Sequence, residues 1–116
     1  MKTKYIWVTT EFEAFHKWDN APKSVEFLKN LHRHIFKVKV YIEVFHNDRE
    51  IEFISFKRTL TNYLRKQFEL KNVGSCEQIT EEIIEFIKKN YGNNRKIIVD
   101  VSEDGENGAI CCWKVY

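Results

Sequence analysis

The stretch HRHIFKVKVYIEVF, residues 32–45, decides the fold class of this chain. Every second residue in it is apolar, so one face of an extended chain would carry Phe36, Val38, Val40, Ile42 and Val44. Lys37, Lys39 and Glu43 lie on the opposite face. This period of two is typical of a strand that packs one face on a core and exposes the other to solvent. We therefore expect an antiparallel sheet with one wet face.

The rest of the chain adds further strands and a pair of helices. Periodicity predicts strands at 6–16 and 32–45, helices that begin after Glu52 and at Ser75, and strands at 96–102 and 109–116. Gln78 completes a capping box with Ser75, and Pro22 marks a turn between the first two strands. One α+β domain, residues 1–116, is expected, with the order β-β-α-α-β-β, a four-stranded antiparallel sheet and two helices on one face.

The composition is that of an ordinary globular domain, with 43% hydrophobic and 31% charged residues. The net charge of +2 comes from 19 basic and 17 acidic residues spread along the chain, so no basic stripe points to nucleic acid or an anionic membrane surface. No apolar run approaches the roughly 18 residues of a transmembrane helix, and no signal peptide is expected. The three cysteines are an odd number and two of them are adjacent, which suits no disulfide framework and favours a reducing cytoplasm.

Three of the four histidines are placed where two strands would bring them together. His32 and His34 are two residues apart, so both side chains leave the same face of a strand. His16 ends the first strand, in phase with its apolar positions. Three imidazoles that converge without a fourth protein ligand describe a catalytic zinc site with an open position. The alternative is that these are structural or exposed histidines at strand ends.

Two further residues are candidates for chemistry. Glu103 continues the apolar face of its strand, where it either bonds the turn that follows or accepts N–H groups from a ligand. Cys76 follows the N-cap of the second helix, where the helix dipole lowers the pKa of a thiol. The alternative for Cys76 is that it only fills space beside the cap.

Several short motifs, in one order along the chain, resemble those of 6-pyruvoyltetrahydropterin synthase and 6-carboxytetrahydropterin synthase, a group with the tunnelling fold. Residues 12–16 are similar to the Phe-x-Ala-Ala-His strand of this group, and residues 31–34 to its Leu-His-Gly-His, with Arg33 in place of glycine. Its Asp-Phe-x-x-Leu-Lys helix start, its Pro-Thr-Ser-Glu and its closing Val-x-Glu are similar to residues 52–57, 74–77 and 101–103. The resemblance covers nearly the whole chain.

This resemblance implies a zinc ion on His16, His32 and His34, and a pterin or purine-like ring held by Glu103. It also implies that the segment with Ser75 and Glu77 lies against the ligand at a subunit boundary, in a homo-hexamer built from trimers. The implied activity is that of a carbon–oxygen lyase acting on dihydroneopterin triphosphate or a related substrate. In the group, zinc polarises side-chain hydroxyls of the substrate while a cysteine and an Asp-His pair move protons.

The chain departs from the group at the residues that move protons. Leu28 is found where the group has its catalytic cysteine, and residues 63–73 contain neither aspartate nor histidine where the Asp-His pair is expected. Cys76, Glu52 and His46 are the candidate substitutes, with Cys76 the preferred one.

Three functions therefore remain open. The leading hypothesis is a zinc-dependent lyase of the 6-pyruvoyltetrahydropterin synthase type. The second is a non-catalytic pterin- or purine-binding module that keeps the metal site and the ring-binding glutamate. The third is a structural assembly protein with incidental histidines. Zinc content separates the third from the others, and turnover separates the first from the second.

Overall fold

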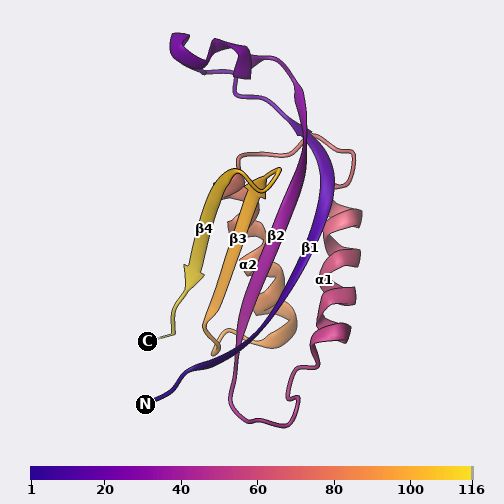
Figure 1. The fold of residues 1–116 in the computed structure, drawn as a ribbon, viewed down its shortest axis with the longest axis vertical. Coiled ribbons are helices and arrows are strands. Elements are labelled where there is room, and N and C mark those ends of the chain that lie inside the picture. The colour runs from indigo at the N-terminus through magenta and orange to yellow at the C-terminus, as the bar shows by residue number, and fades with distance from the viewer. Residues whose placement is uncertain (116) are drawn as a thin grey trace.

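The structure, a computed structural model that describes residues 1–115, has the predicted order of strands and helices. Its elements are β1 (Lys4–His16), the 3-10 helix η1 (Lys23–Lys29), β2 (His32–Val44), α1 (Phe53–Phe68), α2 (Cys76–Tyr91), β3 (Ile97–Glu103) and β4 (Asn107–Trp113). The strands form one four-stranded antiparallel sheet in the order β1-β2-β3-β4 (Figure 1). The α+β class and the order β-β-α-α-β-β are confirmed.

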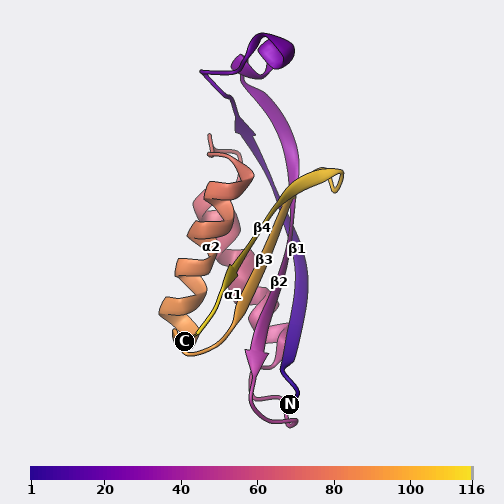
Figure 2. The ribbon, with the colours of Figure 1, turned by 90° about the vertical axis from the view of Figure 1, so that its left-hand side faces the viewer.

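Both α-helices cover the same face of the sheet (Figures 1 and 2). Helix α1 packs on β1, and α2 packs on β3 and β4. The β2 residues predicted to face inward are all buried, with at most 7% of their surface exposed. Each large apolar side chain buried between the sheet and the helices contributes roughly 1.5–3 kcal/mol to stability, so this layer holds the fold together. Its largest members are Phe12, Phe36, Phe56, Ile42, Leu60, Leu64, Ile79, Ile83, Ile87 and Ile97. No helix among the described residues is long and apolar enough to cross a membrane.

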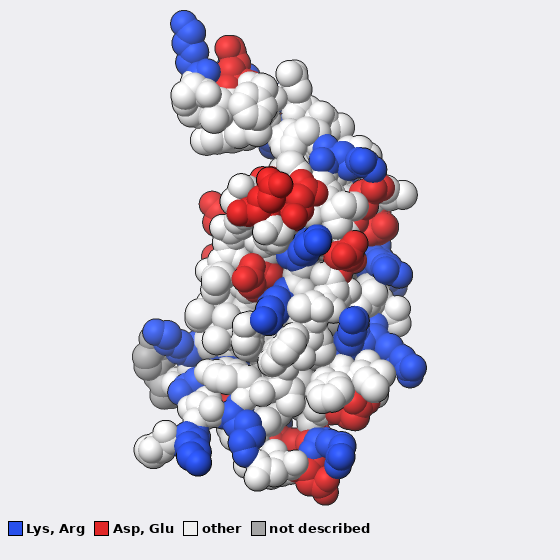
Figure 3. Space-filling model, viewed as in Figure 1, with Lys and Arg blue, Asp and Glu red and all other residues white. Residues whose placement is uncertain are grey.

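The other face of the sheet is wet, as the alternation in β2 predicts. Lys37 is exposed there, and the Nζ atom of Lys39 lies 4.4 Å and 5.1 Å from the ring centroids of Trp7 and Tyr41. Figure 3 shows charges of both signs interspersed over this face, with acidic side chains gathered over the β3–β4 turn.

Two local features differ from the expectation. The helix η1 replaces a simple turn after Pro22, and it contains no buried residue, so no apolar periodicity could reveal it. The last strand begins at Asn107, two residues earlier than predicted, and ends at Trp113, while Tyr116 lies outside the described residues. Gly108 pairs with Ser102 in this added part of the strand, and a Cβ atom there would lie 2.0 Å from the Val101 carbonyl oxygen, so the close approach of the two strands requires glycine.

Candidate metal centre

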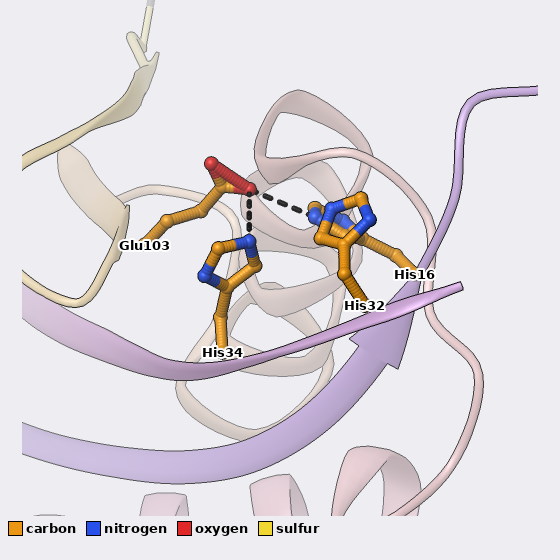
Figure 4. A group of neighbouring side chains, drawn as sticks. All are labelled: His16, His32, His34 and Glu103. Atoms are coloured by element: carbon orange, nitrogen blue, oxygen red, sulfur yellow. Dashed lines mark ion pairs between the residues drawn. The ribbon is translucent and has the colours of Figure 1, made fainter. Parts of the chain in front are cut away.

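Three histidines meet at the end of the sheet where β1 finishes and β2 begins. The antiparallel register pairs His16 with His32 and sets His34 opposite Ala14. The three imidazole rings stand edge to face, with centroids 4.5, 5.0 and 5.3 Å apart. The rings that the sequence predicted to converge do lie together (Figure 4).

Glu103, the last residue of β3, joins these histidines. The β2–β3 register pairs it with Phe36, two residues from His34. Its Oε2 atom lies 2.8 Å from Nε2 of His16 and 3.4 Å from Nε2 of His34. The candidate ligand atoms of all four residues lie within 4.8 Å of one another. The sequence placed Glu103 near a ligand ring but did not predict that its carboxylate would also be a member of the histidine cluster.

The second nitrogen of each imidazole is held by a hydrogen-bond acceptor. Nδ1 of His16 lies 3.1 Å from the carbonyl oxygen of Gly74, and Nδ1 of His32 lies 2.8 Å from that of Asn30. Carbonyl oxygens only accept, so Nδ1 is the donating nitrogen of both rings, and Nε2 is the nitrogen that faces the cluster. This outer ring of acceptors is the arrangement that orients metal-binding histidines in proteins.

The third imidazole, that of His34, has a charged partner that no sequence pattern predicts. Oδ2 of Asp104 lies 2.7 Å from Nδ1 of His34. Hydrogen bonds from His34 and from the Ile35 backbone N–H hold the pKa of Asp104 below its usual range. The only sequence signal for Asp104 was its position directly after Glu103, in a turn.

The chemistry of this donor set fits a divalent metal ion. Three neutral imidazole nitrogens and a carboxylate oxygen are ligands that zinc and its neighbours in the transition series bind. In a tetrahedral zinc site with bonds of about 2.0–2.1 Å, ligand atoms are roughly 3.3–3.4 Å apart, and the candidate ligand atoms here lie within 4.8 Å of one another. The cluster of His16, His32, His34 and Glu103 is therefore able to hold a metal ion.

A cavity of about 750 Å³ opens beside the cluster. It brings the predicted residues Ser75, Cys76 and Glu77, at the start of α2, to the same space as the metal centre. Trp18 and Leu28, from the segment between β1 and β2, add apolar surface to its lining. The other lining residues are His16, Lys17, His32, Gly74, Gln78, Glu103, Asn107 and Gly108. A flat, partly apolar ligand would find both surface and polar partners here.

The expectation that the helix dipole lowers the pKa of Cys76 is wrong. Burial raises the pKa of this thiol to about 11, and the nearby carboxylates of Glu103, Glu77 and Asp100 act in the same direction. Desolvation of the thiolate outweighs the attraction of the helix N-terminus. Cys76 is therefore a neutral thiol near pH 7, able to donate a proton but not to act as a ready base.

The capping box predicted at the start of α2 is confirmed. The Ser75 hydroxyl accepts a hydrogen bond from the Gln78 backbone N–H at 3.1 Å, and the Gln78 side chain accepts one from the Ser75 N–H at 2.8 Å. These bonds fix the segment that lines the cavity.

Two of the candidate substitutes for the missing proton-transfer groups lie far from the centre. His46 and Glu52 follow the far end of β2, which spans 13 residues from His32, or roughly 40 Å at 3.3 Å per residue. The Glu52 carboxylate instead caps α1, accepting hydrogen bonds from the backbone N–H groups of Ile54 at 2.7 Å and Ser55 at 3.0 Å. Within one chain, neither residue reaches the metal centre, and the expectation for both is corrected.

Comparison with solved structures identifies the fold. The 6-pyruvoyltetrahydropterin synthase of Caenorhabditis elegans matches with a TM-score of 0.69 at 15% identity, over 100% of this chain and 98% of that chain. The fold is that of 6-pyruvoyltetrahydropterin synthase. Two structures of the Plasmodium vivax synthase match with a TM-score of 0.70 at 15% and 16% identity, over 99% of this chain and 100% of each of theirs; both carry a substitution of a catalytic glutamate. No family model and no curated protein matches the sequence, so the chain is a divergent example of this fold.

Proposed function

We propose that the protein is a zinc-dependent lyase of the 6-pyruvoyltetrahydropterin synthase type, acting on dihydroneopterin triphosphate or a related pterin or purine-derived substrate. The observation that carries this proposal is the cluster of His16, His32, His34 and Glu103, which opens on a cavity in a chain with the fold of that synthase. Zinc binds imidazole through one ring nitrogen while the other is held by an acceptor, and in all three histidines Nδ1 is the nitrogen that is held.

The residues of the cavity have different proposed roles, which follow from their chemistry. His16, His32 and His34 would hold the zinc, which when bound supplies a Lewis acid that polarises substrate hydroxyls. With zinc held by the three histidines alone, the Glu103 carboxylate would no longer be the partner of their Nε2 atoms. This carboxylate is then free to accept two parallel N–H groups from a pterin ring. Trp18 supplies an aromatic surface for that ring.

The candidate proton-transfer residues lie at the start of α2. The Cys76 thiol, neutral at pH 7 because burial raises its pKa to about 11, is suited to giving a proton to a developing anion. A glutamate is a catalytic residue of the Plasmodium vivax enzyme, so a carboxylate is compatible with chemistry in this fold. Glu77, which lines the same cavity next to Cys76, is therefore the second candidate.

The second candidate function is a pterin- or purine-binding module without turnover. Leu28, where the resemblance implies a catalytic cysteine, lines the cavity, and the raised pKa of Cys76 leaves no thiolate there at neutral pH. Both observations favour a protein that keeps the ligand site and has lost the chemistry. Under this alternative the zinc and Glu103 would still hold the ring.

We also propose that the protein works as a homo-hexamer built from trimers. The edge strands of the sheet are β1 and β4; residues 70–73 cover only the end of β1, at Glu13 and Phe15, and the remaining edge groups need covering. Trp18, Phe27 and Leu31, in the segment that joins β1 to β2, are 49–68% exposed and would be covered in such an assembly. Cys76, Cys111 and Cys112 are free thiols, which suits a cytoplasmic location.

The decisive experiment measures turnover and binding on the same zinc-loaded protein. Release of triphosphate from dihydroneopterin triphosphate, followed by chromatography of the pterin product, is the result expected of the lyase. Binding of a pterin without product would favour the module. The absence of both turnover and pterin binding in protein with full zinc occupancy would refute the proposed function.

A further inference from the structure

The turn between β3 and β4 presses one carboxylate against the strand that carries two of the histidines. Oδ2 of Asp104 lies 2.7 Å from Nδ1 of His34, and Oδ1 accepts a hydrogen bond from the Ile35 backbone N–H at 3.0 Å. The Asp104 N–H in turn donates to the Ile35 carbonyl oxygen at 2.8 Å. Backbone and side chain of Asp104 are therefore both fixed against β2.

This partner differs in kind from those of the other two histidines. His16 and His32 meet carbonyl oxygens of the backbone, which no substitution of a side chain removes. His34 meets a carboxylate from another strand connection. A charged acceptor binds an N–H more strongly than a neutral one and makes the ring a better electron donor at its far nitrogen.

We propose that Asp104 is a positioning residue of the metal centre, which fixes His34 with its proton on Nδ1 and its Nε2 lone pair directed at the cluster. This role rests on the proposed zinc-dependent function. Asp104 acts through His34 and does not itself touch the metal position. The consequence is that metal affinity depends on a side chain outside the set of ligands.

The backbone at this position makes a clean substitution available. Asp104 and Gly105 have φ values of 59° and 78°, the positive values that both central residues of a type I′ turn require. Asparagine adopts such values at least as readily as aspartate. Asp104→Asn therefore changes the hydrogen-bonding groups without straining the turn.

The chemistry of the amide predicts what this variant does. Asp104 accepts from two donors, one on each oxygen, whereas asparagine has one acceptor oxygen and one NH₂ group. If the amide oxygen keeps the Ile35 N–H, the NH₂ group faces Nδ1 of His34. The ring must then move its proton to Nε2 and loses the lone pair that would bind the metal.

The test is the zinc affinity of metal-free full-length protein, measured by competition with a chromophoric chelator. We expect Asp104→Asn to bind zinc about 10- to 100-fold more weakly than the parent. Glu106→Gln is the matched control because it removes the same charge from the same turn. Glu106 contacts the cluster residues through its backbone N–H, which donates to the Glu103 carbonyl oxygen, and the substitution leaves this bond in place. This control should bind zinc like the parent.

A second readout is the tautomer of His34 in the metal-free proteins, from the nitrogen chemical shifts of its ring. We expect the proton on Nδ1 in the parent and on Nε2 in Asp104→Asn. Unchanged zinc affinity and an unchanged tautomer in Asp104→Asn, with the parent binding zinc tightly, would overturn the role of Asp104 and leave the metal centre intact. An equal loss in Glu106→Gln would also overturn it, because net charge alone would then explain the effect. A parent protein that binds no zinc would overturn both.

Discussion

Replacing Glu103 with glutamine tests how this carboxylate is used, because the change keeps the shape of the side chain and removes its charge. The Glu103 side chain is 23% exposed, and its Oε2 lies 2.8 Å from Nε2 of His16. From that partly buried position it can accept two N–H groups of a pterin ring, in charge-assisted bonds worth about 1.5–3 kcal/mol each. The glutamine amide accepts one N–H and turns its own NH₂ group toward the other. We expect pterin binding to weaken by about 2–5 kcal/mol, or roughly 30- to 4,000-fold.

Titration calorimetry with a pterin on zinc-loaded parent and Glu103→Gln measures this loss directly. The zinc content of each sample is determined in parallel, because a weaker metal site would also lower pterin binding. Glu106→Gln, in the neighbouring turn, controls for the change in net charge. A variant with full zinc occupancy that binds the pterin as tightly as the parent would refute the role of Glu103 in holding the ring. Loss of zinc in Glu103→Gln, with pterin affinity restored to that of the parent once zinc is supplied in excess, would assign the carboxylate to the metal instead.

Three further predictions concern residues around the cavity and at the ends of the sheet. The pKa of Cys76 is raised to about 11 in the folded protein, so the stability that its neutral thiol contributes is present below about pH 8.5 and is lost as the pH rises toward 11. Chemical unfolding at increasing pH should show this loss in the parent but not in Cys76→Ser. An equal loss of stability in both proteins would contradict the prediction. Glu52→Ala removes the cap of α1 and should lower the free energy of unfolding with zinc binding unchanged, whereas weaker zinc binding would place Glu52 at the site. Gly108→Ala puts a Cβ 2.0 Å from the Val101 carbonyl oxygen, so thermal unfolding should occur at a clearly lower temperature, and an unchanged midpoint would refute the close pairing of β3 and β4.

The sequence was sufficient to predict the convergence of the histidines. The phase of His16 with the apolar face of its strand, and the spacing of His32 and His34, determine which way the side chains point once β1 and β2 pair. Because a shift of one residue in register would expose the whole apolar face, burial fixes that pairing. The alternation of residues along each strand and the pairing of β1 with β2 are therefore enough to predict where the three histidines lie.

The remaining features depend on contacts between segments far apart in the sequence. Glu103 enters the cluster because β3 pairs with β2 so that it lies beside Phe36, and Asp104 follows from the turn behind it. The pKa of Cys76 depends on how deeply the start of α2 is buried, which outweighs the local effect of the helix dipole. The helix η1 has no buried face, so no pattern in its sequence distinguishes it from a turn.

The metal content of purified protein tests the central claim most directly. The parent, purified without chelator and measured by elemental analysis, should contain about one zinc per chain, and the double variant His32→Ala, His34→Ala should contain none. His46→Ala is the matched control, since His46 lies at the far end of β2 and should leave the zinc in place. A parent without zinc, or a double variant with full zinc occupancy, would contradict the account.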